Sequence, residues 1–226
     1  MKRIFLLALA LALGVTTAVI AQEDVVSLRK TATEQAKTGE YAAAVTNFTK
    51  AIQLQEAAGV TDTALYFNAA VSAYKGKDYN NGAKYFDKCI QLGYEKEKCY
   101  KFGGACLQNI EDYGQLQTTM TKATEEFPAN STFKQMLSTS YVGQAKPKLN
   151  EANNIIKNAE PLKSSDVEKY NAEIAKAKQV FSDILPTVEK AYTTNPENKS
   201  AIQLLAVLYG NIGETAKANE MKAKLK

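Results

Sequence analysis

The sequence predicts an all-α chain made of paired short helices, and three observations carry this prediction. Small and apolar residues recur with spacings of three, four and three, which keeps them on one face of a helix. This pattern recurs along the chain with a nearly constant period. Short polar turns, such as Gly39-Glu40 and Lys77-Asp78, separate the two helices of a pair.

The second helix of each pair gives the clearest signal. Its inner face mixes small residues with larger apolar ones, so that neighbouring helices approach closely while the larger side chains fill the space between them. The first members lie at positions 41, 79, 113, 181 and 215, so the successive steps are 38, 34, 68 and 34, and the step of 68 is twice 34. The five sets are Tyr41, Ala44, Phe48 and Ala51; Tyr79, Gly82, Phe86 and Cys89; Tyr113, Leu116, Met120 and Ala123; Phe181, Ile184, Val188 and Ala191; and Thr215, Ala218, Lys222 and Leu225.

The first helix of most pairs is indicated by a similar set that precedes the polar turn. A shared face of a helix is again the simplest explanation of the spacing, and buried packing explains the residue types. The sets are Leu28, Thr31, Ala32 and Gln35; Tyr66, Ala69, Ala70 and Ala73; Tyr100, Gly103, Gly104 and Leu107; and Ile202, Leu205, Ala206 and Tyr209.

These motifs resemble the tetratricopeptide-repeat (TPR) family from about residue 25 to residue 226. A turn followed by tyrosine occurs three times, for example as Gly39-Glu40-Tyr41, and helix-ending prolines occur at Pro128 and Pro196. The resemblance implies an all-α fold, a right-handed α-solenoid of TPR helix hairpins, in a single domain over residues 22–226. It places repeats at about 25–58, 63–96, 97–130 and 199–226.

Residues 131–198 span two repeat lengths but break the pattern. From Val167 to Ala191 the apolar residues keep heptad spacing, which suits a long packing of two helices. We therefore expect one elongated hairpin, with two degenerate repeats as the alternative. Ser164 or Ser165 is expected to cap its second helix. Pro147 and Pro186 are each expected to kink a long helix. The stretch from Leu185 to Tyr192 is similar to exported TPR proteins of Bacteroidota-type bacteria.

Residues 1–21 have the three-part layout of a secretory signal peptide. Basic Lys2 and Arg3 precede an apolar run that is short for a membrane span of roughly 20 residues. Small residues end at Ala21, so Gln22 is the expected mature N-terminus; a retained membrane anchor is the alternative. No later stretch is apolar enough to span a bilayer. We therefore expect an exported protein of the periplasm or cell envelope.

The composition argues against several classes of function. Lys and Arg number 28 against 24 Asp and Glu, a balance that gives no case for nucleic-acid binding. The chain has no histidine, the commonest general base and metal ligand. The three cysteines lack the spacing of a zinc site. We expect no enzyme activity, no cofactor and no bound metal.

Cys89 and Cys99 invite a geometric interpretation. They lie near facing helix ends, each five positions from Tyr94 in the connecting turn, so an antiparallel hairpin would bring them together. In an oxidising compartment they could form a disulfide. The alternative is that Cys89 replaces a small packing residue, since free cysteine behaves as a small hydrophobe. With that disulfide formed, Cys106 would be the odd thiol, buried in the core.

The TPR resemblance also implies a binding groove along the outward face of the first helices. We expect this groove at Arg29, Lys30, Thr33, Phe67, Asn68, Lys75, Lys98, Lys101 and Phe102. Some TPR proteins clamp a peptide's C-terminal carboxylate with Lys, Arg and Asn, and here Arg29, Asn68 and Lys98 match that pattern. Thr33 and Phe102 depart from it, so the clamp is partial at most, and ordinary solvated side chains are the alternative.

The sequence thus favours a non-catalytic TPR scaffold that binds an acidic or amphipathic segment of a protein partner in the cell envelope. The rival is a self-associating structural component that uses the elongated hairpin. An enzyme or accessory domain is a third class, which the residue spacings do not support. The sequence leaves the partner and the oligomeric state open.

Overall fold

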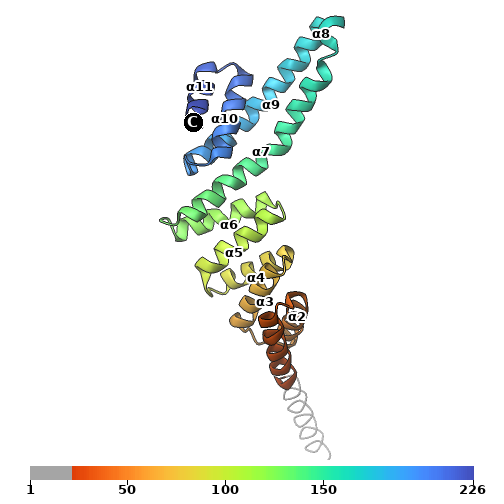
Figure 1. Cartoon of the computed structure of the whole chain (residues 1–226), viewed down its shortest axis with the longest axis vertical. Coiled ribbons are helices and arrows are strands. Elements are labelled where there is room, and N and C mark those ends of the chain that lie inside the picture. Colours follow the sequence, from red (N-terminus) through yellow and green to blue (C-terminus); the bar gives the residue numbers. More distant parts are fainter. Residues whose placement is uncertain (1–21) are drawn as a thin grey trace, which may run out of the picture. The chain divides into compact units, whose positions relative to one another are not determined.

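The structure, a computed structural model, describes residues 22–226, and all of the regular secondary structure in this range is helical (Figure 1). The expected signal peptide lies outside the described residues. Contacts divide the chain into two compact units, with the boundary between Ile110 and Glu111. This boundary falls inside the expected third repeat, residues 97–130. In the described range no helix is both long and apolar enough to cross a membrane.

The first unit is a succession of antiparallel helices. Residues 22–38 are helical and are followed by α2 (Tyr41–Ala57), α3 (Thr63–Lys75), α4 (Tyr79–Gln91) and α5 (Lys96–Asn109). Helix α2 packs on α3, α3 on α4, and α4 on α5. The fully buried rings of Phe48 and Phe86 fill the space between neighbouring helices, surrounded by alanines with no exposed surface. The alternation of large and small residues therefore builds the core as expected.

Aspartates fix where two of these helices begin. The Asp62 carboxylate accepts a hydrogen bond from the Leu65 backbone N–H, and the Asp78 carboxylate accepts one from the Asn81 N–H. Each bond satisfies a donor that the first turn of a helix leaves free. The turn before α4 also holds Lys77 at a φ of 61°, in the left-handed region. The turns are thus set by local chemistry.

Glycines allow the closest helix approaches within the first unit. A Cβ on Gly82 would lie 2.7 Å from the Sγ of Cys106, and one on Gly103 would lie 3.1 Å from the Cβ of Phe86. These positions are where α4 and α5 meet. The two glycines therefore act as packing residues, as the repeat pattern requires.

The second unit contains α6 (Tyr113–Glu126), α7 (Ser131–Ala159), the short α8 (Leu162–Ser165), α9 (Val167–Thr194), α10 (Lys199–Ile212) and α11 (Thr215–Ala223). Helices α7 and α9 are the long pair drawn in green and blue in Figure 1. They pack along each other, α6 packs on α7, and α10 packs on α9 and α11. The elongated hairpin expected from the heptad pattern is confirmed, and the alternative of two ordinary repeats is wrong.

A buried polar cluster ties the base of the long hairpin together. The Ser138 hydroxyl donates to the Ala191 carbonyl at 2.7 Å, and the Asn198 side-chain amide donates to the Ser138 oxygen at 2.7 Å. Asn198 also caps α10 by accepting from the Ser200 and Ala201 N–H groups. Because buried polar groups are costly unless paired, this cluster specifies how α7, α9 and α10 meet.

The two ends of the hairpin differ in burial. Phe181, Ile184 and Val188 are buried at the base, whereas Val167 near the tip is 59% exposed. Helices α7 and α9 continue past Pro147 and Pro186; the expected kinks stay predictions. The cap prediction was wrong, because Asp166, not Ser164 or Ser165, accepts from the Lys169 N–H at 3.0 Å and begins α9.

Gly143→Ala is expected to lower the free energy of unfolding by about 1–3 kcal/mol, because an added methyl group would occupy the space of the Tyr113 ring. Gly210→Ala is the matched control. Gly210 lies at an exposed position of α10 with open space around it, so alanine there should stabilise by roughly 1 kcal/mol through helix propensity. Urea unfolding followed by circular dichroism measures both. Equal effects would contradict the close approach of α6 and α7.

Candidate functional site

The groove residues expected from the sequence all lie in the first unit, on three of its helices. The helix of residues 22–38 carries the first group, α3 the second and α5 the third. In that order they are Arg29, Lys30 and Thr33; Phe67, Asn68 and Lys75; and Lys98, Lys101 and Phe102. Nothing in the structure tests whether these residues bind a ligand, so the groove stays a prediction.

Phe67 and Phe102 belong to a continuous row of aromatic rings. The ring centroids of Phe67 and Phe86 are 6.3 Å apart, those of Phe86 and Phe102 are 6.0 Å apart, and those of Phe102 and Tyr74 are 5.2 Å apart. Tyr94 extends the row at 5.7 Å from Phe67. Except for the fully buried Phe86, these rings are half-buried, so they pack on the core and still offer an apolar surface.

The sequence interpretation missed Tyr74 as a member of this surface. Tyr74 follows Phe67 by seven positions on α3, two helical turns along the same face, so the spacing was a usable signal. Tyr94 gave no such signal, because it lies in the turn between α4 and α5.

Two of the three residues expected to clamp a carboxylate already bind carboxylates of this chain. The Arg29 guanidinium lies 2.9 Å from Asp62, the residue that caps α3, and the Lys98 ammonium lies 2.8 Å from Glu95. The hydrogen bond with Glu95 raises the pKa of Lys98. Asn68, the third clamp residue, is half-buried on α3. An incoming carboxylate would therefore compete with internal ones.

The size of that competition is modest. The Arg29 and Lys98 side chains are 41% and 61% exposed, and solvent screening makes exposed ion pairs weak. Lys101 and Lys75 lie over aromatic rings instead, with their ammonium groups 5.7 Å from the Phe102 centroid and 6.0 Å from the Tyr41 centroid. A ligand can displace any of these contacts, but it gains less from Arg29 and Lys98 than from a free cation.

Cys89 and Cys99 lie together between α4 and α5 as free thiols with no exposed surface. Cys99 donates to the Tyr94 carbonyl at 3.3 Å. Its hydrogen bond with Cys89, together with burial, raises the pKa of the Cys99 thiol. Burial, reinforced by the charge of Asp78, raises the pKa of Cys106 to about 12. The disulfide between Cys89 and Cys99 stays a prediction. No group of three or more Cys, Asp or Glu within residues 22–226 is arranged to hold a metal ion.

A second concave feature, which the sequence interpretation missed, lies between α2 and α4. We call it the α2–α4 cleft. It consists of two cavities of about 490 and 360 Å³ that share Thr49, Lys84 and Tyr85 in their walls. The residues of the expected groove take no part in its walls. The first unit therefore offers two separate surfaces, the half-buried aromatic row on α3 and α5 and this cleft.

Comparisons with known proteins bear on the fold. No protein-family model matches the chain, and no curated protein matches it. A crystal structure of MamA protein superposes with a TM-score of 0.51 at 12% identity, over 90% of this chain and 91% of that one. The fold is of the TPR type. The predicted class, all-α with TPR helix hairpins, one of them elongated, is thus confirmed.

Two further solved structures are similar over most of their length. MamA from Desulfovibrio magneticus RS-1 gives a TM-score of 0.47 at 15% identity, over 89% of this chain and 93% of that one. A TPR repeats protein from Bacteroides fragilis gives 0.45 at 19% identity, over 88% and 98%. At such identities a likeness concerns the fold alone, and the resemblance to exported Bacteroidota-type proteins stays a prediction.

The three thiols are expected to resist Ellman's reagent in the folded protein at mildly alkaline pH, because none has exposed surface. A raised pKa also keeps Cys99 and Cys106 protonated, whereas the hydrogen bond with Cys99 lowers the pKa of Cys89, so burial alone protects Cys89. In guanidinium chloride all three should react. After incubation with oxidised glutathione and unfolding, a disulfide between Cys89 and Cys99 would leave one reactive thiol, whereas Cys89→Ala, which cannot form this disulfide, would keep two. Rapid labelling of the folded protein would contradict the buried arrangement.

Proposed function

We propose that this TPR-fold chain is a non-catalytic scaffold that binds a segment of another protein. The half-buried aromatic row on α3 and α5 is the observation that carries the proposal. Rings that pack on the core and still expose one face give a rigid apolar surface at little entropic cost, a common property of binding hot spots. Lys98 and Lys101 lie beside this row on α5.

The chemistry of the row and its rim indicates the class of ligand. An amphipathic segment would place apolar side chains on the rings around Phe67 and Phe102 and acidic ones near Lys75 and Lys101. The internal pairing of Arg29 and Lys98 argues against recognition of a single terminal carboxylate as the main source of affinity. The apolar contacts supply most of the affinity in this proposal, and the lysines select for acidic neighbours.

Export to the periplasm or cell envelope is part of the same proposal. Its support is the sequence of residues 1–21, with a basic start, a short apolar run and small residues before Gln22. A scaffold there would have envelope proteins as partners. Amino-terminal sequencing of the protein recovered from envelope fractions tests this, and a first residue other than Gln22 would contradict the expected cleavage.

A second candidate is self-association through the elongated hairpin. The exposed Val167 and the half-buried Tyr170 and Ile174 near its tip favour it, because they continue the apolar seam beyond its buried part. Against tight pairing, most neighbouring exposed positions on α7 and α9 carry Lys, Glu or Asn. Sedimentation equilibrium of the purified protein discriminates between the two candidates, since a concentration-dependent dimer abolished by Val167→Glu would favour the second.

The Lys98→Glu/Lys101→Glu variant is expected to lose a partner that the wild-type protein captures from envelope extracts, because both charges beside the aromatic row are reversed. Lys148→Glu/Lys157→Glu makes the same change in charge on exposed positions of α7 and should capture normally. Circular dichroism checks that both variants fold. Capture that survives the first variant and fails in the second would move the binding surface to the elongated hairpin.

A further inference from the structure

The α2–α4 cleft has a rigid floor. Both of its helices pack on α3, whose C-terminal end contributes Ser72, Ala73 and Gly76 to the larger cavity. Both cavities have Tyr85 in their walls, and this residue is only 3% exposed. The cleft is therefore a fixed feature of the core packing and does not depend on a mobile loop.

A hydrogen bond bridges the two helices across this floor. The Thr49 hydroxyl donates to the Val45 carbonyl at 2.7 Å, so its single proton is already used. The 2.7 Å bond between Thr49 and Tyr85 must then run from the phenol to the threonine oxygen. Tyr85 on α4 is thus held against α2, and the width of the cleft is fixed at this point.

Each carboxylate in the cleft is hydrogen-bonded within the chain. Asp78 accepts from the backbone and side-chain amides of Asn81 at 3.2 and 2.7 Å. Glu56 accepts from the Tyr66 hydroxyl. Asp87 accepts from the Gln91 side-chain amide at 2.6 Å. Each of these neutral donors occupies a carboxylate oxygen and holds the side chain in place, but it does not cancel the charge.

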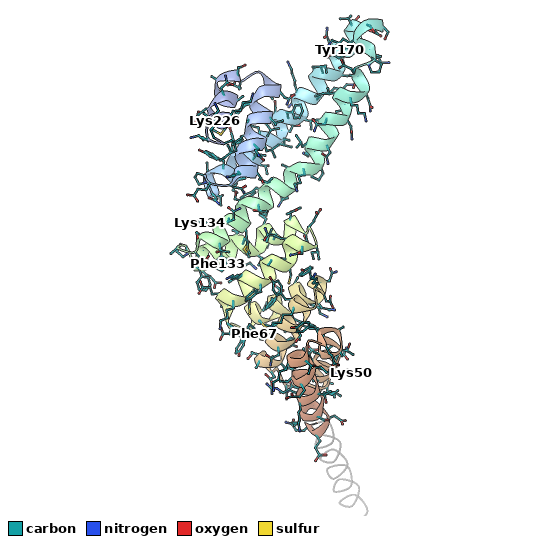
Figure 2. The ribbon with its side chains drawn as sticks, viewed as in Figure 1. Lys50, Phe67, Phe133, Lys134, Tyr170 and Lys226 are labelled. Atoms are coloured by element: carbon teal, nitrogen blue, oxygen red, sulfur yellow. The ribbon has the colours of Figure 1, made fainter. Side chains whose placement is uncertain are left out.

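The three lysines of the cleft differ from these carboxylates in the partners they have. Lys50, Lys84 and Lys88 form no ion pair with any residue in the described part of the chain. Lys84 and Lys88 lie over the rings of Tyr85 and Tyr66, at 5.5 and 5.9 Å from the ring centroids. Figure 2 labels Lys50, which lies on α2 in the brown part of the ribbon. The cleft therefore presents three cations without anionic partners, whereas Arg29 and Lys98 are paired.

We propose that the α2–α4 cleft binds an acidic peptide segment of a partner protein, whose carboxylates pair with Lys50, Lys84 and Lys88. In the larger cavity Lys50 and Lys84 outnumber the one carboxylate, Asp78, so its walls carry an excess of positive charge, and the two cavities of about 490 and 360 Å³ have room for a few side chains. A nucleic-acid backbone would need a longer track of cations, and here carboxylates are interspersed with them. This surface is separate from the aromatic row, so it does not rest on the function proposed above.

The test is binding of a fluorescein-labelled peptide of alternating Glu and Ser, measured by fluorescence anisotropy with the purified protein. This probe has no apolar side chain, so it should not bind the aromatic row. We expect Lys50→Glu/Lys84→Glu to weaken binding by roughly tenfold or more, and the affinity of the wild-type protein to fall as salt is added. The matched control, Lys148→Glu/Lys157→Glu, makes the same change in charge at exposed positions of α7 and should bind like the wild type.

Three outcomes would overturn the proposal: no binding to the wild-type protein, an equal loss in the control variant, or tighter binding of an oligothymidylate with the same dependence on Lys50 and Lys84. If the charge-reversed variant fails to fold, Lys50→Gln/Lys84→Gln replaces it, with the same expected direction. Amide chemical shifts of the wild-type protein give an independent measurement. They should move at Thr46, Thr49 and Asn81 as peptide is added, and shifts centred on α3 and α5 would count against the cleft.

Discussion

The close approach of neighbouring helices is the constraint on which the rest of each unit depends. Where helices meet, a glycine faces a larger group: Gly82 faces Cys106, Gly103 faces Phe86 and Gly143 faces Tyr113. A side chain at any of these glycines would push the helices apart, and protein interiors tolerate little such strain. The glycines therefore fix how far each helix is rotated toward its neighbour.

This rotation decides which side chains reach the surface and where. With Phe86 seated on Gly103, the Phe86 ring contacts both Phe67 and Phe102 and joins them into one row. On another face of α4, the same rotation brings Tyr85 to Thr49 of α2 and leaves Lys84 and Lys88 in the walls of the cleft. Both candidate binding surfaces thus follow from the packing of one helix.

The repeating part of the fold could be predicted from the sequence because burial imposes a period. The three-four-three sets mark the helix faces correctly in α2, α4 and α6, and the heptads from Val167 to Ala191 predict the long helix α9. The start of α9 was misplaced because Ser164, Ser165 and Asp166 are all good caps. In the folded chain Ser164 and Ser165 belong to the short helix α8. Asp166, which follows them, is therefore the residue that accepts the hydrogen bond at the start of α9.

The candidate site could be predicted only in part, because pairing between charges depends on contacts that have no period. The sequence places Arg29 and Lys98 on outward helix faces, but Asp62 is 33 residues away from Arg29 and reaches it through the turn before α3. A helix-by-helix interpretation therefore counts Arg29 as free. Glu95, by contrast, lies three positions before Lys98 at the start of α5, so the spacing alone could have indicated this pair.

The distinction between paired and unpaired cations is more informative than their number. An exposed cation that already has a carboxylate adds little when a ligand replaces that partner, because one ion pair is exchanged for another of similar strength. A cation over an aromatic ring keeps its charge available, and the ring limits the conformations it must lose on binding. By this argument the aromatic row should recognise mainly apolar surface, and the α2–α4 cleft mainly charge. A partner with an apolar segment and an acidic one could engage both surfaces of the first unit, and linking two weak contacts in this way raises the overall affinity well above either alone.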